Sequence, residues 1–111
     1  MLPTDPKARK RIPLATGCLD FFPLALAAVA EASRIGNETH YPGEPLHLDR
    51  ARGKSDEHPD CLIRHFMERG TMDTSGATPV LHSAQMAWRA LAILQLEMEE
   101  KLKLSLPRDA R

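Results

Sequence analysis

The segment from Pro79 to about Lys103 limits the possible folds of this chain most strongly. Proline is favoured at the first position of a helix, and from Ala84 to Leu96 apolar residues surround almost the whole helical circumference. A helix in a small domain needs only one apolar stripe to cover the core. The segment therefore predicts a long helix, and its additional apolar surface predicts a homo-oligomer.

Two shorter helices are predicted before it, over about 20–35 and about 55–70. Gly36 with Asn37, and Gly70, are typical helix stops. The intervening residues 36–54 contain several prolines and glycines and predict a long ordered loop, and 71–78 predict a turn. No convincing strand-type alternation competes with the helices. The predicted fold class is therefore all-α, a compact bundle of three main helices with a long ordered loop between the first two.

The length of 111 residues suits one domain of ordinary size. Residues 13–104 are predicted to form this single helical domain. A basic N-terminal segment over 1–12 precedes it, and a C-terminal tail over 105–111 follows it. Both ends are expected to fray.

Charge and cysteine content narrow the function classes. Fifteen basic and fifteen acidic residues give a net charge of zero, so the chain has no general attraction to nucleic acid or to an anionic membrane. The two cysteines form no CxxC motif and predict free thiols in a reducing compartment. The longest apolar stretch is interrupted by Asp20 and Pro23 and is too short to cross a bilayer. These features predict a soluble cytoplasmic protein.

Ionisable side chains interrupt the apolar helical faces, and these interruptions are the candidate site. Glu31 is expected on the buried face of the first helix, beside Ala27, Ala28 and Ile35. An ionised carboxylate there costs several kcal/mol unless a cation or hydrogen-bond donors meet it. An ion pair with Arg34 or another helix, and a role as a metal or substrate ligand, are both compatible with this position.

The second helix offers Asp60, Arg64 and His65. Asp60 and Arg64 are spaced i,i+4, which is typical of a surface ion pair worth roughly 0.3 to 0.5 kcal/mol. His65 is predicted to face inward, either as a core histidine with satisfied nitrogens or as a functional group. His58, Cys61 and His65 also share a face and could approach one metal ion as zinc ligands do, although no second spaced pair completes a set of four.

The third helix opens with His82, and a polar strip that includes Gln85 and Arg89 continues its face. This strip is predicted to point toward His65. His82 and Arg89 could bind phosphate or a base near the helix N-terminus, or His82 could simply be solvated. Lys54, with two neighbouring arginines, forms a basic group just before the second helix that could also hold phosphate, or be a solvated loop.

The common nucleotide, metalloprotease and hydrolase motifs GxxxxGK[ST], GxGxxG, HExxH and GxSxG are absent. The strings ASRIGNETHYPGEPLH, DCLIRHFMERGTMD and HSAQMAWRALAILQLE do occur, in this order. On these strings, over about two-thirds of its length, the chain resembles small phage and bacterial domains known as the dATP/dGTP diphosphohydrolase N-terminal domain. The resemblance implies a helical domain that handles purine deoxynucleotides, cleaving a triphosphate to monophosphate and pyrophosphate with Mg²⁺, in the host cytoplasm if phage-encoded.

The all-α pyrophosphohydrolases of the MazG type are a more distant comparison. They hold Mg²⁺ with ExxE on one helix and ExxD on the next, and neither Glu31 nor the pair Asp60 and Glu68 reproduces that spacing. Because phosphoryl chemistry usually depends on metal-bound oxygens, this departure bears on catalysis more than on nucleotide binding.

Three hypotheses follow for function. The first is a nucleoside triphosphate diphosphohydrolase that uses Mg²⁺ or Mn²⁺. Its metal ligands would be Glu31 and Asp60, its catalytic residues Asp60, His65 and His82, and its phosphate-binding residues Lys54, Arg64 and Arg89. The second is a non-catalytic binder that sequesters a nucleotide or a nucleotide-derived signal. The third is a helical structural or interaction protein whose polar residues only satisfy one another.

Overall fold

The computed structural model describes residues 2–46 and 55–103, and it is mostly helical, as predicted. In chain order its elements are the α-helix α1 (Pro6–Lys10), the π-helical turn η1 (Ala15–Leu19), α2 (Pro23–His40), the 3₁₀ turn η2 (Ser55–Glu57), α4 (His58–Met67), the strands β1 (Met72–Asp73) and β2 (Val80–Leu81), and α5 (His82–Leu102). The predicted phosphate-binding residue Lys54 and the predicted tail over 105–111 lie outside the described residues.

Helix α2 contradicts the predicted stop at Gly36 and Asn37, because it continues to His40. Glycine in a helix interior is less favourable than alanine by about 1 kcal/mol, a cost that neighbouring contacts can offset. In the final turns, Nη1 of Arg34 donates to both carboxylate oxygens of Glu38, at 2.9 and 3.0 Å. Gly36 therefore lies within the helix and does not end it.

Helix α4 agrees more closely with prediction. The 3₁₀ turn η2 leads directly into it, its first turn accepts Pro59, and its regular part ends at Met67. Gly70 follows with a φ of +82°, a conformation that suits glycine because it has no Cβ. The stop predicted at this glycine is confirmed to within a few residues.

A short β-hairpin joins α4 to α5, where only a turn was predicted. Its antiparallel strands pair Met72 with Leu81 and Asp73 with Val80. The turn begins with Asp73, whose side chain accepts a hydrogen bond from the backbone N–H of Ser75 at 3.0 Å, a common turn arrangement for aspartate. Because Val80 and Leu81 pair in the hairpin, α5 begins at His82 and not at the predicted Pro79.

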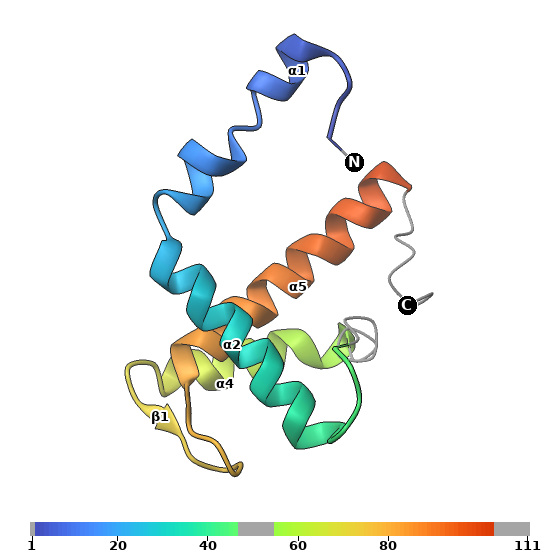
Figure 1. The fold of residues 1–111 in the computed structure, drawn as a ribbon. Helices are drawn as coiled ribbons and strands as arrows, with labels where there is room; N and C mark the ends of the chain where they lie inside the picture. Colours follow the sequence, from blue (N-terminus) through green and yellow to red (C-terminus); the bar gives the residue numbers. More distant parts are fainter. Residues whose placement is uncertain (1, 47–54, 104–111) are drawn as a thin grey trace.

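The long helix α5 is the centre of the packing, with α4 and α2 against it (Figure 1). Among the described residues, the buried apolar side chains are mostly small and come from these three helices: Ala32, Ile35, Cys61, Ala84 and Ala92. Three histidines are buried with them, His58, His65 and His82. A core with this share of ionisable side chains requires specific polar partners for them.

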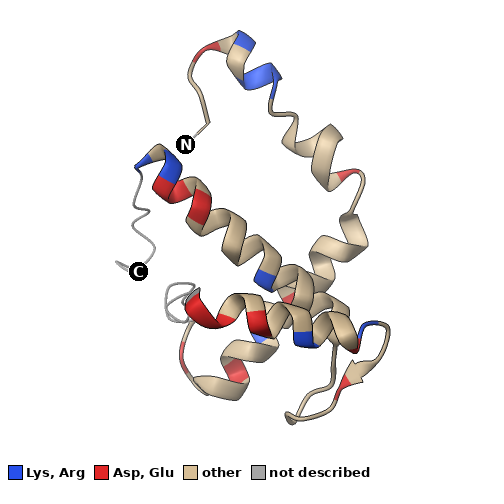
Figure 2. Cartoon of the chain, turned by 180° about the vertical axis from the view of Figure 1, so that it is seen from behind, with Lys and Arg blue, Asp and Glu red and all other residues tan. Residues whose placement is uncertain are grey.

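The N-terminal segments α1 and η1 lead away from the packed helices (Figure 1). Residues Pro6–Lys10 form a short exposed helix, which Asp5 caps by accepting from the Ala8 N–H at 3.0 Å. Basic residues gather on α1, and acidic residues gather near the end of α5 (Figure 2). The net charge of zero therefore conceals an uneven distribution.

Within residues 2–46 and 55–103, no individual helix has both the length and the apolar character needed to cross a membrane. The segments Pro6–Leu19 and Pro23–His40 meet that criterion only when taken together, and they are bent by 85° relative to each other.

Candidate metal centre

Two polar pairs connect α4 to α5. His65 Nδ1 lies 2.8 Å from His82 Nδ1, and His58 Nδ1 lies 2.8 Å from an Nη atom of Arg89. The partners are seven residues apart on each helix and pair in opposite order, which is the pattern of antiparallel helices. Seven residues are two helical turns, or about 10 Å. The predicted polar strip of α5 therefore does face His65, and a second pair lies two turns away.

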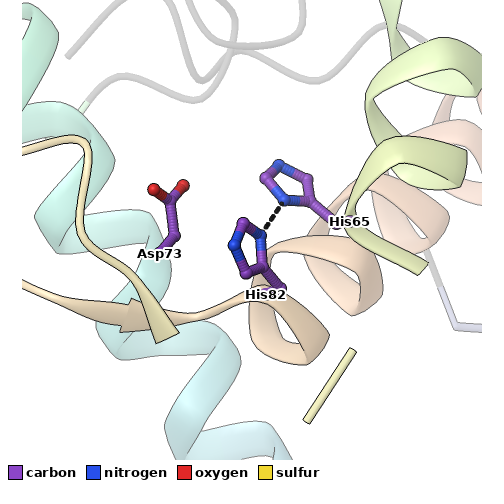
Figure 3. Close-up of side chains that lie close together, drawn as sticks. All are labelled: His65, Asp73 and His82. Carbon is purple, nitrogen blue, oxygen red and sulfur yellow. Dashed lines mark hydrogen bonds between the residues drawn. The ribbon is translucent and has the colours of Figure 1, made fainter. Parts of the chain in front are cut away.

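Asp73 lies near the pair His65 and His82, and the three residues form a cluster of possible metal ligands (Figure 3). One ligand atom from each of the three side chains lies within 4.8 Å of the other two. His65 comes from the last turns of α4, His82 is the first residue of α5, and Asp73 ends β1. The hairpin register brings the carboxylate here, because Asp73 pairs with Val80, two residues before His82.

The histidines of this cluster are buried, with 5% of His65 and 8% of His82 exposed. Burial lowers the pKa of His65, and the nearby His82 and Arg64 lower it further, while Asp73 opposes them. A lowered pKa keeps the imidazole neutral around neutral pH, and neutral imidazole is the form that binds metal ions.

Asp73 is held as an ionised carboxylate. The hydroxyl of Ser75 donates to Oδ1 at 2.7 Å, and the amide of Gln85 donates to Oδ2 at 2.9 Å. These two bonds and the Ser75 backbone N–H hold the pKa of Asp73 far below its usual range. A carboxylate has about four lone-pair positions, so three hydrogen bonds orient the group and leave room for one more partner. Metal-binding carboxylates are commonly supported in this way.

Glu68, which follows α4, extends the cluster on its exposed side. Its Oε2 lies 3.5 Å from Nε2 of His82, and 57% of its side chain is exposed. A proton on Nε2 of His82 would face this carboxylate, which favours the arrangement in which His65 Nδ1–H donates to Nδ1 of His82. His65 thus holds His82 on the buried side, and the exposed Glu68 lies near its other ring nitrogen.

A pocket of about 230 Å³ lies beside the cluster, between α2, the hairpin and the first turns of α5. It is lined by Ala32, Ile35, Gly36, Thr39, His40, Asp73, Ser75, Gly76, Thr78, Val80 and Gln85. Asp73 and Gln85 belong to both the pocket wall and the hydrogen-bond network of the cluster. A molecule in this pocket would therefore reach the candidate metal ligands through Asp73.

The predicted metal ligands Glu31 and Asp60 are both exposed and do not belong to the cluster. Glu31 was expected on the buried face of its helix. The buried stripe of α2 instead contains Ala32 and Ile35, and one residue corresponds to a rotation of about 100° around the helix. The cation expected beside Glu31, Arg34, pairs with Glu38.

The two predicted phosphate-binding arginines, Arg64 and Arg89, differ in their exposure to solvent. Arg64 is exposed on α4, and its guanidinium donates to Cys61 Sγ at 3.6 Å. Arg89 is half-buried and contacts His58, so this pairing occupies it inside the α4–α5 interface. His58, Cys61 and His65 share the buried face of α4, as predicted, but His65 forms its metal-type cluster with Asp73 and His82.

Sequence reasoning placed Asp73 only in a turn and among the family motifs, and it missed the ligand role that the geometry suggests. The available signal was the spacing of Asp73, Ser75 and His82, in which a turn-forming aspartate precedes a helix that opens with histidine. Comparison of the chain with protein-family models, with curated proteins and with solved structures found no match.

Proposed function

We propose that this chain binds a divalent metal ion through His65, Asp73 and His82, and through that ion the phosphates of a purine deoxynucleotide. The observation that carries the proposal is the approach of the three ligand atoms to within 4.8 Å of one another. The neutral His65 and the ionised Asp73 are already in the charge states that metal binding requires. Coordination through Nδ1 of His82 would replace its hydrogen bond with His65.

The donor set narrows the choice of ion. Two imidazole nitrogens and one carboxylate oxygen suit Mn²⁺, Fe²⁺ or Zn²⁺, whereas Mg²⁺ prefers oxygen ligands and retains several waters. Of the two ions predicted from sequence, Mn²⁺ therefore fits better. Three protein ligands leave coordination positions for a substrate. A bound ion would supply neutralisation of phosphate charge.

The nucleotide part of the proposal draws on sequence. All three cluster residues lie in the strings that resemble the dATP/dGTP diphosphohydrolase N-terminal domain. Arg64 is exposed one residue before His65 on α4 and acts electrostatically on it. We assign a phosphate to this guanidinium because it is exposed and near His65. Asp73 would orient the ion while Gln85 fixes the carboxylate.

The test measures metal and nucleotide together. Wild-type protein is titrated with Mn²⁺ by calorimetry, and the Mn²⁺-loaded protein is then incubated with dATP or dGTP while monophosphate and pyrophosphate are quantified. We expect saturable Mn²⁺ binding that His82→Ala abolishes and that Glu31→Gln leaves unchanged. Release of pyrophosphate would identify a diphosphohydrolase, and tight binding with intact nucleotide recovered would identify a binder. Absence of Mn²⁺ binding at millimolar concentration would contradict the metal site.

A structural role is the second candidate, and a specific observation favours it. Asp73 accepts three hydrogen bonds from protein groups, and His65 and His82 bond to each other without an ion. Such a network can serve only to satisfy buried polar groups. In that case His65→Ala and His82→Ala would lower stability, and metal ions would not change the melting temperature of the wild-type protein.

We also propose that a second copy of the chain covers the outer face of α5. Large apolar residues are exposed along one stripe of this helix, at Leu91, Leu94, Met98 and Leu102. Their spacing of three or four residues is that of a single helical face. Contiguous apolar surface of this kind is typical of protein interfaces.

A further inference from the structure

The pocket beside the metal cluster contains an unusual residue, Gly36. Glycine is unfavourable in the interior of a helix, and Gly36 lies inside α2, which continues to His40. A Cβ built on it would meet no atom within 4 Å, so close packing does not require the missing side chain. What the glycine leaves is open space at a position that lines the pocket.

The lining of the pocket indicates the chemistry of its occupant. Ala32, Ile35 and Val80 provide apolar surface, and Thr39, Thr78 and Gln85 provide neutral hydrogen-bonding groups. The imidazole of His40, the hydroxyl of Ser75 and the carboxylate of Asp73 complete the polar part of the wall. Among residues 2–46 and 55–103, no lysine or arginine lines the pocket. A phosphate chain would therefore face the Asp73 carboxylate without a lysine or arginine to neutralise it, whereas a neutral, flat group with polar edges would be accommodated.

The size of the pocket agrees with this chemistry. A cavity of ~150 Å³ is sufficient to hold benzene, and this pocket measures about 230 Å³. The additional volume suits a fused two-ring heterocycle. The amide nitrogen of Gln85 donates to Asp73, and its carbonyl oxygen can accept a hydrogen bond from an amino group on such a ring.

We infer that this pocket holds the purine base of the nucleotide while the phosphates extend past Asp73 to the metal ion. This inference rests on the proposed function. It adds that the base, held in this pocket, determines which nucleotide is selected. Asp73 and Gln85 connect the two parts of the site, because both line the pocket and they bond to each other at 2.9 Å.

Gly36→Leu tests the inference without requiring any metal ligand to change. Leucine is a better helix former than glycine, and the space around the new Cβ is open, so we expect an unchanged or higher melting temperature. Ala30→Leu adds a leucine to an exposed position of the same helix that does not line the pocket, and it is the matched control. Gly36→Ala tests whether the effect scales with the volume added.

The probes are dATP and inorganic tripolyphosphate, each titrated into the Mn²⁺-loaded protein. We expect Gly36→Leu to weaken dATP binding at least tenfold and to change tripolyphosphate and Mn²⁺ binding less than twofold, with Ala30→Leu matching the wild type. Wild-type affinity of Gly36→Leu for dATP would overturn the assignment of the base to this pocket. Equal loss of dATP and tripolyphosphate would also overturn it, because the effect would then act at the phosphate site. If the wild type binds neither probe, the proposed function itself fails and the assignment falls with it.

Discussion

Replacing Asp73 by asparagine gives the sharpest test of how the cluster is held together. In the wild type, Ser75 donates to Oδ1 through its backbone N–H at 3.0 Å and its hydroxyl at 2.7 Å, and Gln85 donates to Oδ2 at 2.9 Å. Asparagine keeps one acceptor oxygen and replaces the other by a donor. Either the two donors of Ser75 or the donor of Gln85 therefore faces an NH₂ group. The bonds that remain are made to a neutral amide and no longer to a negatively charged carboxylate.

The magnitude follows from these bonds. Hydrogen bonds to a charged group contribute about 1.5–3 kcal/mol each when well buried. The two bonds from Ser75 are exposed and the bond from Gln85 is half-buried, so the contributions are smaller than for buried groups and do not add fully. We expect Asp73→Asn to lower the free energy of unfolding by about 2 kcal/mol at pH 7. With an unfolding entropy of roughly 2.1 cal/mol/K per residue, this corresponds to a decrease of about 8 °C in the melting temperature.

The contribution of Asp73 to the free energy of unfolding also depends on pH. The pKa of Asp73 is lower in the folded than in the unfolded protein. As the pH falls, the unfolded chain therefore takes up a proton at this carboxylate before the folded protein does. The stabilisation by ionised Asp73 is complete well above the ordinary aspartate pKa of about 3.9 and is lost on acidification below that pKa. Asp73→Asn should show a smaller decrease in stability between pH 5 and pH 3, because the group that causes this part of the loss is gone.

The assay is thermal and urea unfolding followed by circular dichroism at 222 nm, for the wild type, Asp73→Asn and the control Asp60→Asn. Asp60 is exposed in the first turn of α4, so its substitution should cost no more than the ~1 kcal/mol expected for a charge near a helix N-terminus. The reasoning would be refuted if Asp73→Asn had wild-type stability at pH 7 together with an unchanged acid profile.

Three further predictions concern the neighbouring groups. Because the pKa of His65 is lowered in the folded protein, the wild type should lose stability as the pH falls below about 6.5, and His65→Gln should reduce that slope in urea titrations at pH 7.5 to 5. Glu68→Gln should change the free energy of unfolding by less than about 0.5 kcal/mol, because its carboxylate is exposed and 3.5 Å from His82; a larger loss in the same urea titrations would show that Glu68 fixes the imidazole. Leu94→Glu should lower the molar mass measured by light scattering toward that of one chain if a second copy covers α5, and an identical mass at all concentrations would count against this interface.

Much of the helical part of the site was predictable from periodicity. Residues three, four and seven apart share a helical face, so the inward direction of His65 and the strip beginning at His82 could be identified before any packing was known. The contact between Nδ1 atoms at 2.8 Å confirms that the two faces meet. The same periodicity did not predict that Glu31 is exposed, because the burial of a residue beside the buried stripe of α2 depends on how the helix is rotated against α5.

The amino-acid sequence by itself determined the mostly helical fold, the end of α4 near Gly70 and the inward direction of His65, because these depend on local propensity and on a regular repeat. Tertiary structure alone decided that α2 passes through Gly36, that Val80 and Leu81 pair as a strand, and that Asp73 joins the two histidines. The position of Asp73 beside the histidines depends on contacts between residues distant in sequence, and the other two outcomes depend on contacts whose free energy exceeds the small preferences of single residues.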